Sequence, residues 1–301
     1  MTKSAHKRPA TTVDPSDYVY HGGFDRQKFI KEVEAHAKAD PIAAAYVNQG
    51  TIFNVADLLD RIGRDPEITD IRWAAYMLAT ATWEGRGVVM TPSAKPKGKP
   101  KRVYLGGRPV EEAGKGRLSQ NNVKPYYLPV KVDKLPDGSA EITEQDGDVF
   151  KVNTSGKITS KSSRRATHGA VYGHHPAQAY VQAAGTEHAY YGRGYCQLTW
   201  WDNYAASGAR IGMGLELLFD PAKALEPEVA YKVMSDGLVH GHGFANGHKL
   251  QQYFFGGHTD YVRARAMVNG TDHASDIAGI ARLYEGALLA SKMSSERSSE
   301  V

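Results

Sequence analysis

The sequence predicts a mainly α-helical protein whose helices are interrupted by a β-rich insertion. Before Val89, apolar residues recur at helical spacing, and similar patterns return after Thr199. Between these two parts, the chain is rich in Lys, Gly, Pro and Ser and contains short runs that alternate apolar and polar residues, as strands do. We therefore divide the chain into a flexible arm at 1–20, the first half of a helical domain at 21–93, the insertion at 94–188, the second half at 189–290 and a flexible tail at 291–301.

Three helices are predicted in the first half. The first carries Phe24, Phe29 and Val33 on one side, with charged residues between them. The second is expected over 54–64, with Asn54 as its N-cap. The third contains WAAYMLATATW, which has eleven residues and no charge. Such uniformity is typical of a buried helix rather than a surface helix.

The insertion is expected to hold a small antiparallel meander. YYLPVKVDKL and AEITEQDGDVFKVN have strand-like patterns and are joined by a turn at Asp137-Gly138. A partly disordered loop is the alternative. The Lys-rich run AKPKGKPKR near the start of the insertion is interleaved with Pro and Gly, which favours a solvated linker. No aromatic residues alternate with these lysines, so we expect no nucleic-acid partner.

Helical patterns in the second half come with recognisable start and stop signals. Thr199 followed by Asp202 resembles a capping box, and Pro221 after Asp220 suits the first turn of another helix. The pair Asn269-Gly270 is typical of a left-handed helix stop. A last helix is expected over ASDIAGIARLYEGALLASK. Together with the first half, these segments predict an all-α body.

Composition narrows the class of protein. The chain has 301 residues, 41% hydrophobic and 23% charged, as a globular protein does. No run approaches the roughly 18 apolar residues of a membrane span. The N-terminus lacks the apolar stretch of a secretory signal, so we expect synthesis in the cytoplasm without a signal peptide. The net charge of +4 favours anionic partners, and the single cysteine, Cys196, excludes an internal disulfide framework.

Glu84 is the first charged residue after the uncharged run of the third helix. Trp73, Tyr76, Met77 and Thr80 share its helical face. A carboxyl group at the end of an apolar stripe loses hydration, which disfavours the anion and raises the pKa, as a general acid requires. The alternative is that Glu84 only marks the point where the helix reaches the surface.

The segment AYYGRGYCQLTWWDNYA is the most distinctive in the chain. Glycines, aromatic rings and polar side chains alternate there in a way that neither a helix nor a strand requires. Glycines let a backbone approach a ligand, and aromatic faces stack on sugar rings. The segment therefore favours a carbohydrate groove, with an aromatic-rich structural turn as the alternative.

YYGRGYCQLTWWDNY resembles the signature of the family 19 glycoside hydrolases, the chitinases and phage endolysins of lysozyme-like fold. YMLATATWEGRG resembles the helix that ends in the general acid of this family, and RPVEEAGKGR resembles the stretch with its second carboxylate. The helical segments after 219 resemble the endolysin branch. The resemblance covers 68–93, 108–117 and 189–290. It implies a lysozyme-like helical catalytic domain. This family commonly has His before the acid, where this chain has Trp83.

The resemblance also implies roles for individual residues. Glu84 matches the proton donor, and Glu112, in preference to its neighbour Glu111, matches the base that activates water. Thr199 matches the residue that helps to hold this water. The remaining matches are with substrate-binding positions of the groove: Tyr191, Gln197, Trp200, Asn203 and Asn269. Structural alternatives are a helix cap for Thr199, a helix stop for Asn269 and a solvated loop pair for the two glutamates.

The resemblance, together with the two candidate carboxylates, implies an inverting mechanism, which requires neither a cofactor nor a metal. The substrate we expect is peptidoglycan, cut at a β-1,4 bond by a monomeric endolysin that reaches the wall after holin-dependent release or virion delivery. Alternatives are a chitinase that cuts N-acetylglucosamine polymers, a non-catalytic wall-binding or virion protein, and a separate binding role for the insertion.

Histidine and cysteine patterns indicate no further chemistry. His174-His175 and His240-Gly-His242 are the closest histidine pairs, with His168 and His188 as neighbours, and no HExxH or Cys-rich spacing accompanies them. We therefore expect no metal site. Cys196 stands where the resembling family tolerates apolar residues, which favours a small buried side chain over a nucleophile.

Overall fold

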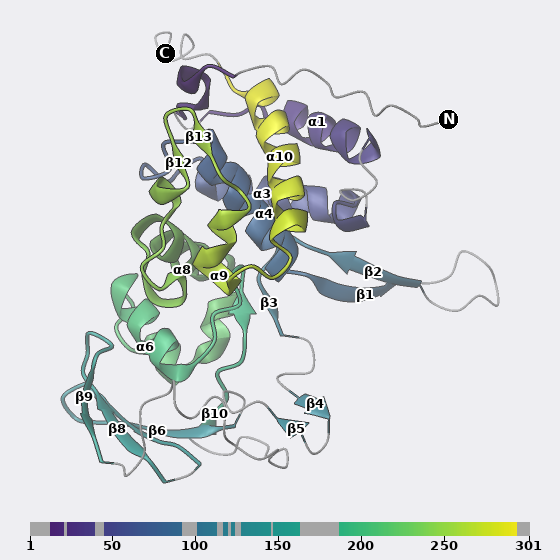
Figure 1. The fold of residues 1–301 in the computed structure, drawn as a ribbon. Coiled ribbons are helices and arrows are strands. Elements are labelled where there is room, and N and C mark those ends of the chain that lie inside the picture. Colours follow the sequence, from purple (N-terminus) through teal and green to yellow (C-terminus); the bar gives the residue numbers. More distant parts are fainter. Residues whose placement is uncertain are drawn as a thin grey trace, which may run out of the picture.

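The computed structural model describes residues 13–20, 23–39, 45–91, 101–112, 117–119, 122–123, 128–145, 147–162 and 187–293. Over these residues the protein is mainly α-helical with a smaller β region, as the sequence predicts. In Figure 1 the helices form the upper and middle parts, and a small sheet lies at the lower edge. No helix of the described residues is long and apolar enough to cross a lipid bilayer.

Helices surround a buried core formed from both halves of the chain. The helices with α geometry are α1 (Arg26–Ala39), α3 (Gln49–Ile62), α4 (Ile71–Glu84), α6 (Trp201–Arg210), α7 (Glu216–Phe219), α8 (Pro227–His240), α9 (Ala266–Asn269) and α10 (Ala274–Ser291). Short 3-10 turns lie at η1 (Pro15–Tyr18), η3 (Pro221–Leu225), η4 (Gly243–Ala245), η5 (Leu250–Gln252) and η6 (Arg263–Arg265).

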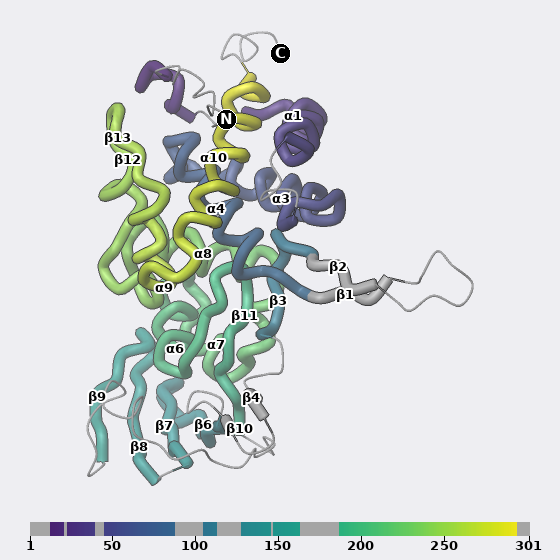
Figure 2. Tube along the Cα trace, turned by 45° about the vertical axis from the view of Figure 1, so that its right-hand side comes forward, coloured from purple at the N-terminus to yellow at the C-terminus, as the bar shows by residue number. Residues whose placement is uncertain are grey.

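Helix α4 is the centre of the core. Every residue from Ile71 to Trp83 except Trp73 is buried, in agreement with the absence of charge over 73–83, and the buried Arg72 just before this run pairs with Asp70. Helix α10 runs alongside α4, with α1 and α3 next to them (Figure 2). The Thr82 hydroxyl lies 2.8 Å from the Tyr284 hydroxyl, which joins α4 to α10. Burial of each large apolar side chain here contributes about 1.5–3 kcal/mol.

The strands form several small sheets. They are β1 (Gly87–Thr91), β2 (Lys101–Leu105), β3 (Val110–Glu111), β4 (Arg117–Ser119), β5 (Asn122–Val123), β6 (Val130–Lys134), β7 (Ala140–Thr143), β8 (Val149–Val152), β9 (Ile158–Lys161), β10 (Glu187–His188), β11 (Arg193–Gly194), β12 (Phe254–Phe255) and β13 (His258–Thr259). Strands β1 and β2 pair as a hairpin that extends away from the helices (Figure 1).

The predicted meander is confirmed. The five-stranded sheet has the order β10-β6-β7-β8-β9. From β6 to β9, each strand pairs antiparallel with the strand that follows it in the sequence. Gly138, in the expected turn, has φ of 82°, a left-handed conformation that glycine adopts without steric cost. Val132, Ile142 and Phe150 are buried, so one face of the sheet packs on the protein.

The five-stranded sheet packs on α6, and this contact places it next to the distinctive segment of the second half. The rings of Phe150 and Trp201 have centroids 5.1 Å apart. The Trp201 indole Nε1 donates a hydrogen bond to Glu144 Oε1 at 2.8 Å. A Cβ atom at Gly156 would lie 2.4 Å from the Ala205 carbonyl oxygen, so the turn before β9 lies directly against the helix backbone.

Several boundaries differ from those expected. Residues 13–20 do not form a free arm, because Tyr18 and Tyr20 are buried and the Tyr20 amide donates to Thr69 O. Helix α3 begins at Gln49 with Asn48 as its N-cap, whereas the Asn54 amide donates to Gly106 O. Of the expected tail, Ser291 is the last residue of α10 and Lys292 forms a β-bridge with Phe24. The arm over 1–12, most of the Lys-rich run and the tail over 294–301 lie outside the described residues.

Candidate active site

Tight backbone contacts fix the end of α4, where Glu84 lies. A Cβ atom at Gly85 would be 2.4 Å from Arg108 O, and one at Gly106 would be 2.3 Å from Thr82 O. The segment that follows β2 therefore passes directly against the last turn of α4. This approach brings β3 and Glu112 back to the helix end, although the sequence between them contains the whole β1–β2 hairpin.

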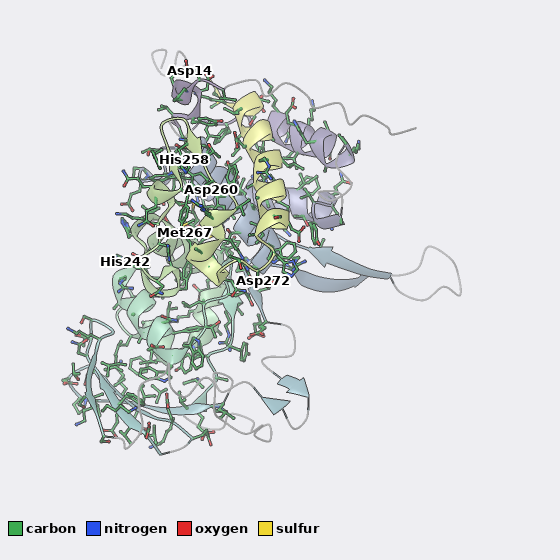
Figure 3. The ribbon with its side chains drawn as sticks, in the orientation of Figure 1. Asp14, His242, His258, Asp260, Met267 and Asp272 are labelled. Atoms are coloured by element: carbon green, nitrogen blue, oxygen red, sulfur yellow. The ribbon has the colours of Figure 1, made fainter. Side chains whose placement is uncertain are left out.

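Glu84 forms an ion pair with Arg265. Its Oε1 lies 2.5 Å from Arg265 Nη1, and the side chains are 17% and 2% exposed. Arg265 Nε donates to the carbonyl oxygen of Asp272 at 2.9 Å, on the connection between α9 and α10 where Figure 3 labels Asp272. The sequence pattern indicated that the Glu84 carboxyl group is partly buried, but it did not indicate the buried arginine beside it.

Strand β3 places the neighbouring glutamates in different surroundings. Glu111 Oε1 accepts from the Tyr191 hydroxyl at 2.8 Å and lies 3.3 Å from Arg193 Nε. Glu112 lines the cleft, and its Oε2 accepts from the Gly192 amide at 3.4 Å. Of the two, Glu112 is therefore the one that can meet a ligand in the cleft, whereas Glu111 is occupied by the segment behind it.

A buried arginine holds the distinctive segment in place. Arg193 Nη1 donates to Ala189 O at 3.0 Å and to the Tyr204 hydroxyl at 3.2 Å, and its guanidinium lies 3.8 Å from the centroid of the Tyr191 ring. Its backbone exchanges hydrogen bonds with Leu198. Burial raises the pKa of Tyr191 to about 12, and its hydrogen bond to Glu111 acts in the same direction. The segment is therefore a rigid turn.

Gln197 and Gly192 fit closely together. Gln197 Nε2 donates to Val110 O at 3.1 Å and to Gly194 O at 3.3 Å. A Cβ atom at Gly192 would lie only 2.6 Å from Gln197 Oε1. Gly194 has φ of 84°, which favours glycine at that position as well. These contacts fix the Gln197 amide at the cleft wall.

The start of α6 differs from the predicted capping box. Helix α6 begins at Trp201, and its N-cap residue, Trp200, makes no side-chain capping hydrogen bond. Trp200 has φ of 83°, which is strained for a side chain of this size. Thr199 Oγ1 donates to Gln197 O at 2.8 Å, and Asn203 Nδ2 donates to Thr199 O at 2.9 Å. Among the described residues no donor bonds to the Asn203 amide oxygen, so this oxygen can accept from a ligand.

Most of the predicted site residues meet in one cleft of about 600 Å³, a volume typical of ligand-binding sites. Tyr191 is the exception, because it packs under Arg193 and is not part of the cleft wall. Asn269 reaches the cleft from the end of α9, where Gly270 with φ of 57° ends the helix. The predicted residues that line the cleft are Glu84, Glu112, Gln197, Thr199, Trp200, Asn203 and Asn269.

Sequence reasoning missed four residues of this region. Arg265 lies in a segment whose pattern resembles an amphipathic helix, where a charged residue is expected to face solvent. No local pattern pairs it with Glu84. Phe244 and Val268 line the cleft, but isolated apolar residues carry no sequence signal of such a role. Arg86 also lines the cleft, and a cation two residues after the candidate acid was a signal that could have identified it.

Histidines and Cys196 add no reactive group that the described residues reveal. No three His, Cys, Asp or Glu side chains gather into a possible metal site within the described part of the chain. His242 lies beyond the end of α8 (Figure 3), with Nδ1 2.9 Å from Asp236 Oδ1. His168 and the His174-His175 pair lie outside the described residues. Burial raises the pKa of the Cys196 thiol, which keeps it neutral.

Comparisons with known proteins add no evidence about function beyond the geometry of the cleft. No family model, no curated protein and no solved structure matches this chain.

Proposed function

We propose that the protein is a glycoside hydrolase of lysozyme-like, family 19 type that cuts β-1,4 bonds of peptidoglycan by an inverting mechanism. The observation that carries this proposal is that Glu84 and Glu112, from separate elements, line one cleft together with Gln197 and Asn203. Two carboxyl groups are the minimum that glycosidic hydrolysis of this type requires, and polar amides suit the N-acetyl and hydroxyl groups of amino sugars.

In this mechanism Glu84 protonates the glycosidic oxygen as the bond to the anomeric carbon breaks. Glu112 removes a proton from a water molecule that attacks the opposite face of the sugar. Inversion of this kind requires the carboxyl groups to be roughly 6.5–9.5 Å apart, which leaves room for the water. The Thr199 oxygen, whose own proton is donated to Gln197 O, can accept a hydrogen bond from that water.

Arg265 has a clear role in this proposal. A general acid becomes an anion when it donates its proton, and the guanidinium 2.5 Å from Glu84 stabilises that anion. Arg265 also fixes the orientation of the carboxyl group, because its own Nε is held by Asp272 O. Proton transfer requires such positioning within hydrogen-bond reach of the substrate oxygen.

Two considerations favour peptidoglycan over chitin. The net charge of +4 suits an anionic bacterial envelope. The helical segments of the second half resemble the endolysin branch of the family rather than the chitinases. Access to the wall after holin-dependent release or virion delivery belongs to the same proposal.

Release of reducing ends from purified sacculi tests the proposal. Wild-type protein is expected to release them, and Glu84→Gln is expected to lower kcat by at least ~10²-fold, the low end for loss of a general acid. Glu112→Gln should be similarly impaired. The control is Glu216→Gln, which changes a carboxylate that is 49% exposed and pairs with Lys223 outside the cleft.

Product masses identify the bond that is cut. Activity of Glu84→Gln within a few-fold of wild type would remove Glu84 from the role of acid. Cleavage of N-acetylglucosamine oligomers without release from sacculi would establish a chitinase instead. Binding to sacculi without hydrolysis of either substrate would establish a non-catalytic wall-binding protein.

A further inference from the structure

Arg86 projects a positive charge into the cleft from a position fixed by aromatic rings. Its guanidinium carbon lies 3.7 Å from the centroid of the Trp83 ring and 5.4 Å from that of Tyr46. The two rings contact each other, with centroids 4.8 Å apart. Arg86 Nε also donates to the Trp83 carbonyl oxygen at 2.8 Å. Contacts with the ring faces and one backbone bond therefore hold the side chain, with no carboxylate of the described residues paired to it.

Within the part of the chain that the structure describes, most of the hydrogen-bonding capacity of Arg86 is unused. A guanidinium has five N–H donors, and only the one on Nε has an acceptor within the described residues. No Asp or Glu of the described part of the chain forms an ion pair with Arg86. By contrast, Arg265 pairs with Glu84 and Arg193 with Glu111. The four N–H groups on Nη1 and Nη2 form a planar fork that matches a carboxylate.

The charged residues of the cleft wall indicate which kind of ligand Arg86 can bind. Glu84 is balanced by Arg265, so Arg86 and Glu112 are the charged residues of the cleft wall without an opposite charge beside them in the described structure. In the proposed mechanism Glu112 is the base and must remain available to water, which explains why no positive charge of the described residues lies beside it. A guanidinium can donate hydrogen bonds to a neutral N-acetylglucosamine chain, but its charge attracts a substrate that carries a carboxylate more strongly.

We propose that Arg86 is a specificity-determining residue that binds a carboxylate of the glycan substrate. This inference rests on the proposed function. The ligand chemistry is a carboxylate attached to an amino-sugar polymer, and peptidoglycan supplies it from two sources. One is the free lactyl group of N-acetylmuramic acid in peptide-free strands. The other is the peptide stem, whose attachment converts the lactyl group to an amide.

Equilibrium binding tests this proposal independently of catalysis. The parent is full-length protein with Glu84→Gln, which prevents turnover, and the probes are N-acetylglucosamine oligomers, peptide-free glycan strands and peptide-bearing strands of matched length. Calorimetric titration should show tighter binding of a carboxylated probe than of the neutral one. Arg86→Met should reduce this preference at least about tenfold, equivalent to about 1.4 kcal/mol. The probe that loses affinity identifies the source of the carboxylate.

Two further variants secure the interpretation. Arg86→Lys retains the charge without the planar fork and should keep part of the preference, which also covers the case in which Arg86→Met fails to fold. Arg263→Met removes an arginine that is 83% exposed outside the cleft, and it should keep the full preference. Added salt should weaken the preference of the parent.

Unchanged preference in both Arg86 variants, or an equal loss in Arg263→Met, would overturn the inference, as would a parent that binds no carboxylated probe. Failure of the proposed function is a separate result. Wild type would then hydrolyse neither kind of peptidoglycan strand, while calorimetry would still report whether Arg86 sets a preference for carboxylates.

Discussion

Replacement of Arg265 by methionine should leave Glu84 as a partly buried charge without its counter-ion. Removal of one partner from a fully buried pair costs about 3–5 kcal/mol. Arg265 is 2% exposed, but Glu84 retains 17% exposure and hence some contact with water. The hydrogen bond from Arg265 Nε to Asp272 O is lost as well. We therefore expect Arg265→Met to lower the free energy of unfolding by about 2–4 kcal/mol at neutral pH.

A double-mutant cycle separates the ion pair from other effects of the substitution. Glu84→Gln in the Arg265→Met background removes the stranded charge, so the double variant should be more stable than the sum of the single changes predicts by about 1–2 kcal/mol. Urea unfolding followed by tryptophan fluorescence measures each free energy.

Additive effects of the two substitutions would refute the reasoning, because groups that do not interact add to within about 0.5 kcal/mol. Arg263→Met is the matched control. Its side chain is 83% exposed and lies 3.6 Å from Asp260 Oδ2, and such surface pairs contribute about 0–1 kcal/mol. A loss as large as that of Arg265→Met in this control would show that burial is not the cause.

Two further predictions concern the segment behind the cleft. Gly192→Ala should lower the free energy of unfolding in urea by about 1–3 kcal/mol, because its Cβ would lie 2.6 Å from Gln197 Oε1. The control is Gly279→Ala in α10, where the Cβ would have no described atom within 4 Å, and this change should be neutral or stabilising. For Tyr191, the raised pKa favours the neutral phenol in the folded state, so its contribution to stability is complete below pH 10 and is lost as pH rises through about 12. Tyr191→Phe should diminish this loss of stability at alkaline pH, and it should lower the free energy of unfolding by about 1–2 kcal/mol at neutral pH. If the free energy of unfolding of Tyr191→Phe depended on pH as that of wild type does, Tyr191 would not be the group responsible.

Much of the scaffold follows from local sequence patterns. The uncharged run of α4 predicts burial because a buried helix has no water to solvate a charge, and Glu84 follows as the point where this constraint ends. The meander was predictable for a similar reason, since alternation and the Asp137-Gly138 turn act over a few residues. Such patterns depend only on residues close together in the sequence, and the structure agrees with the elements they predict.

Interactions between distant elements are where the sequence patterns gave wrong or incomplete predictions. Asn54 has the chemistry of an N-cap, but α3 extends beyond it to Asn48, and its amide is used by Gly106 instead. Thr199 and Asp202 have the spacing of a capping box, but Trp200 is the N-cap residue of α6, and the Thr199 hydroxyl donates to Gln197 O. The partnership of Glu84 and Arg265 depends on how α4 and η6 pack, which no local spacing encodes.

The backbone at Trp200 has a consequence for engineering of this protein. A residue other than glycine held at φ of 83° costs of order 1–3 kcal/mol, which glycine would avoid. Trp200 nevertheless supplies an aromatic ring to the cleft wall. On the backbone cost alone, selection of variants by melting temperature would favour glycine at this position and remove the ring. Under the proposed function this ring contacts the substrate, so a useful library would fix Trp200 and seek stability elsewhere.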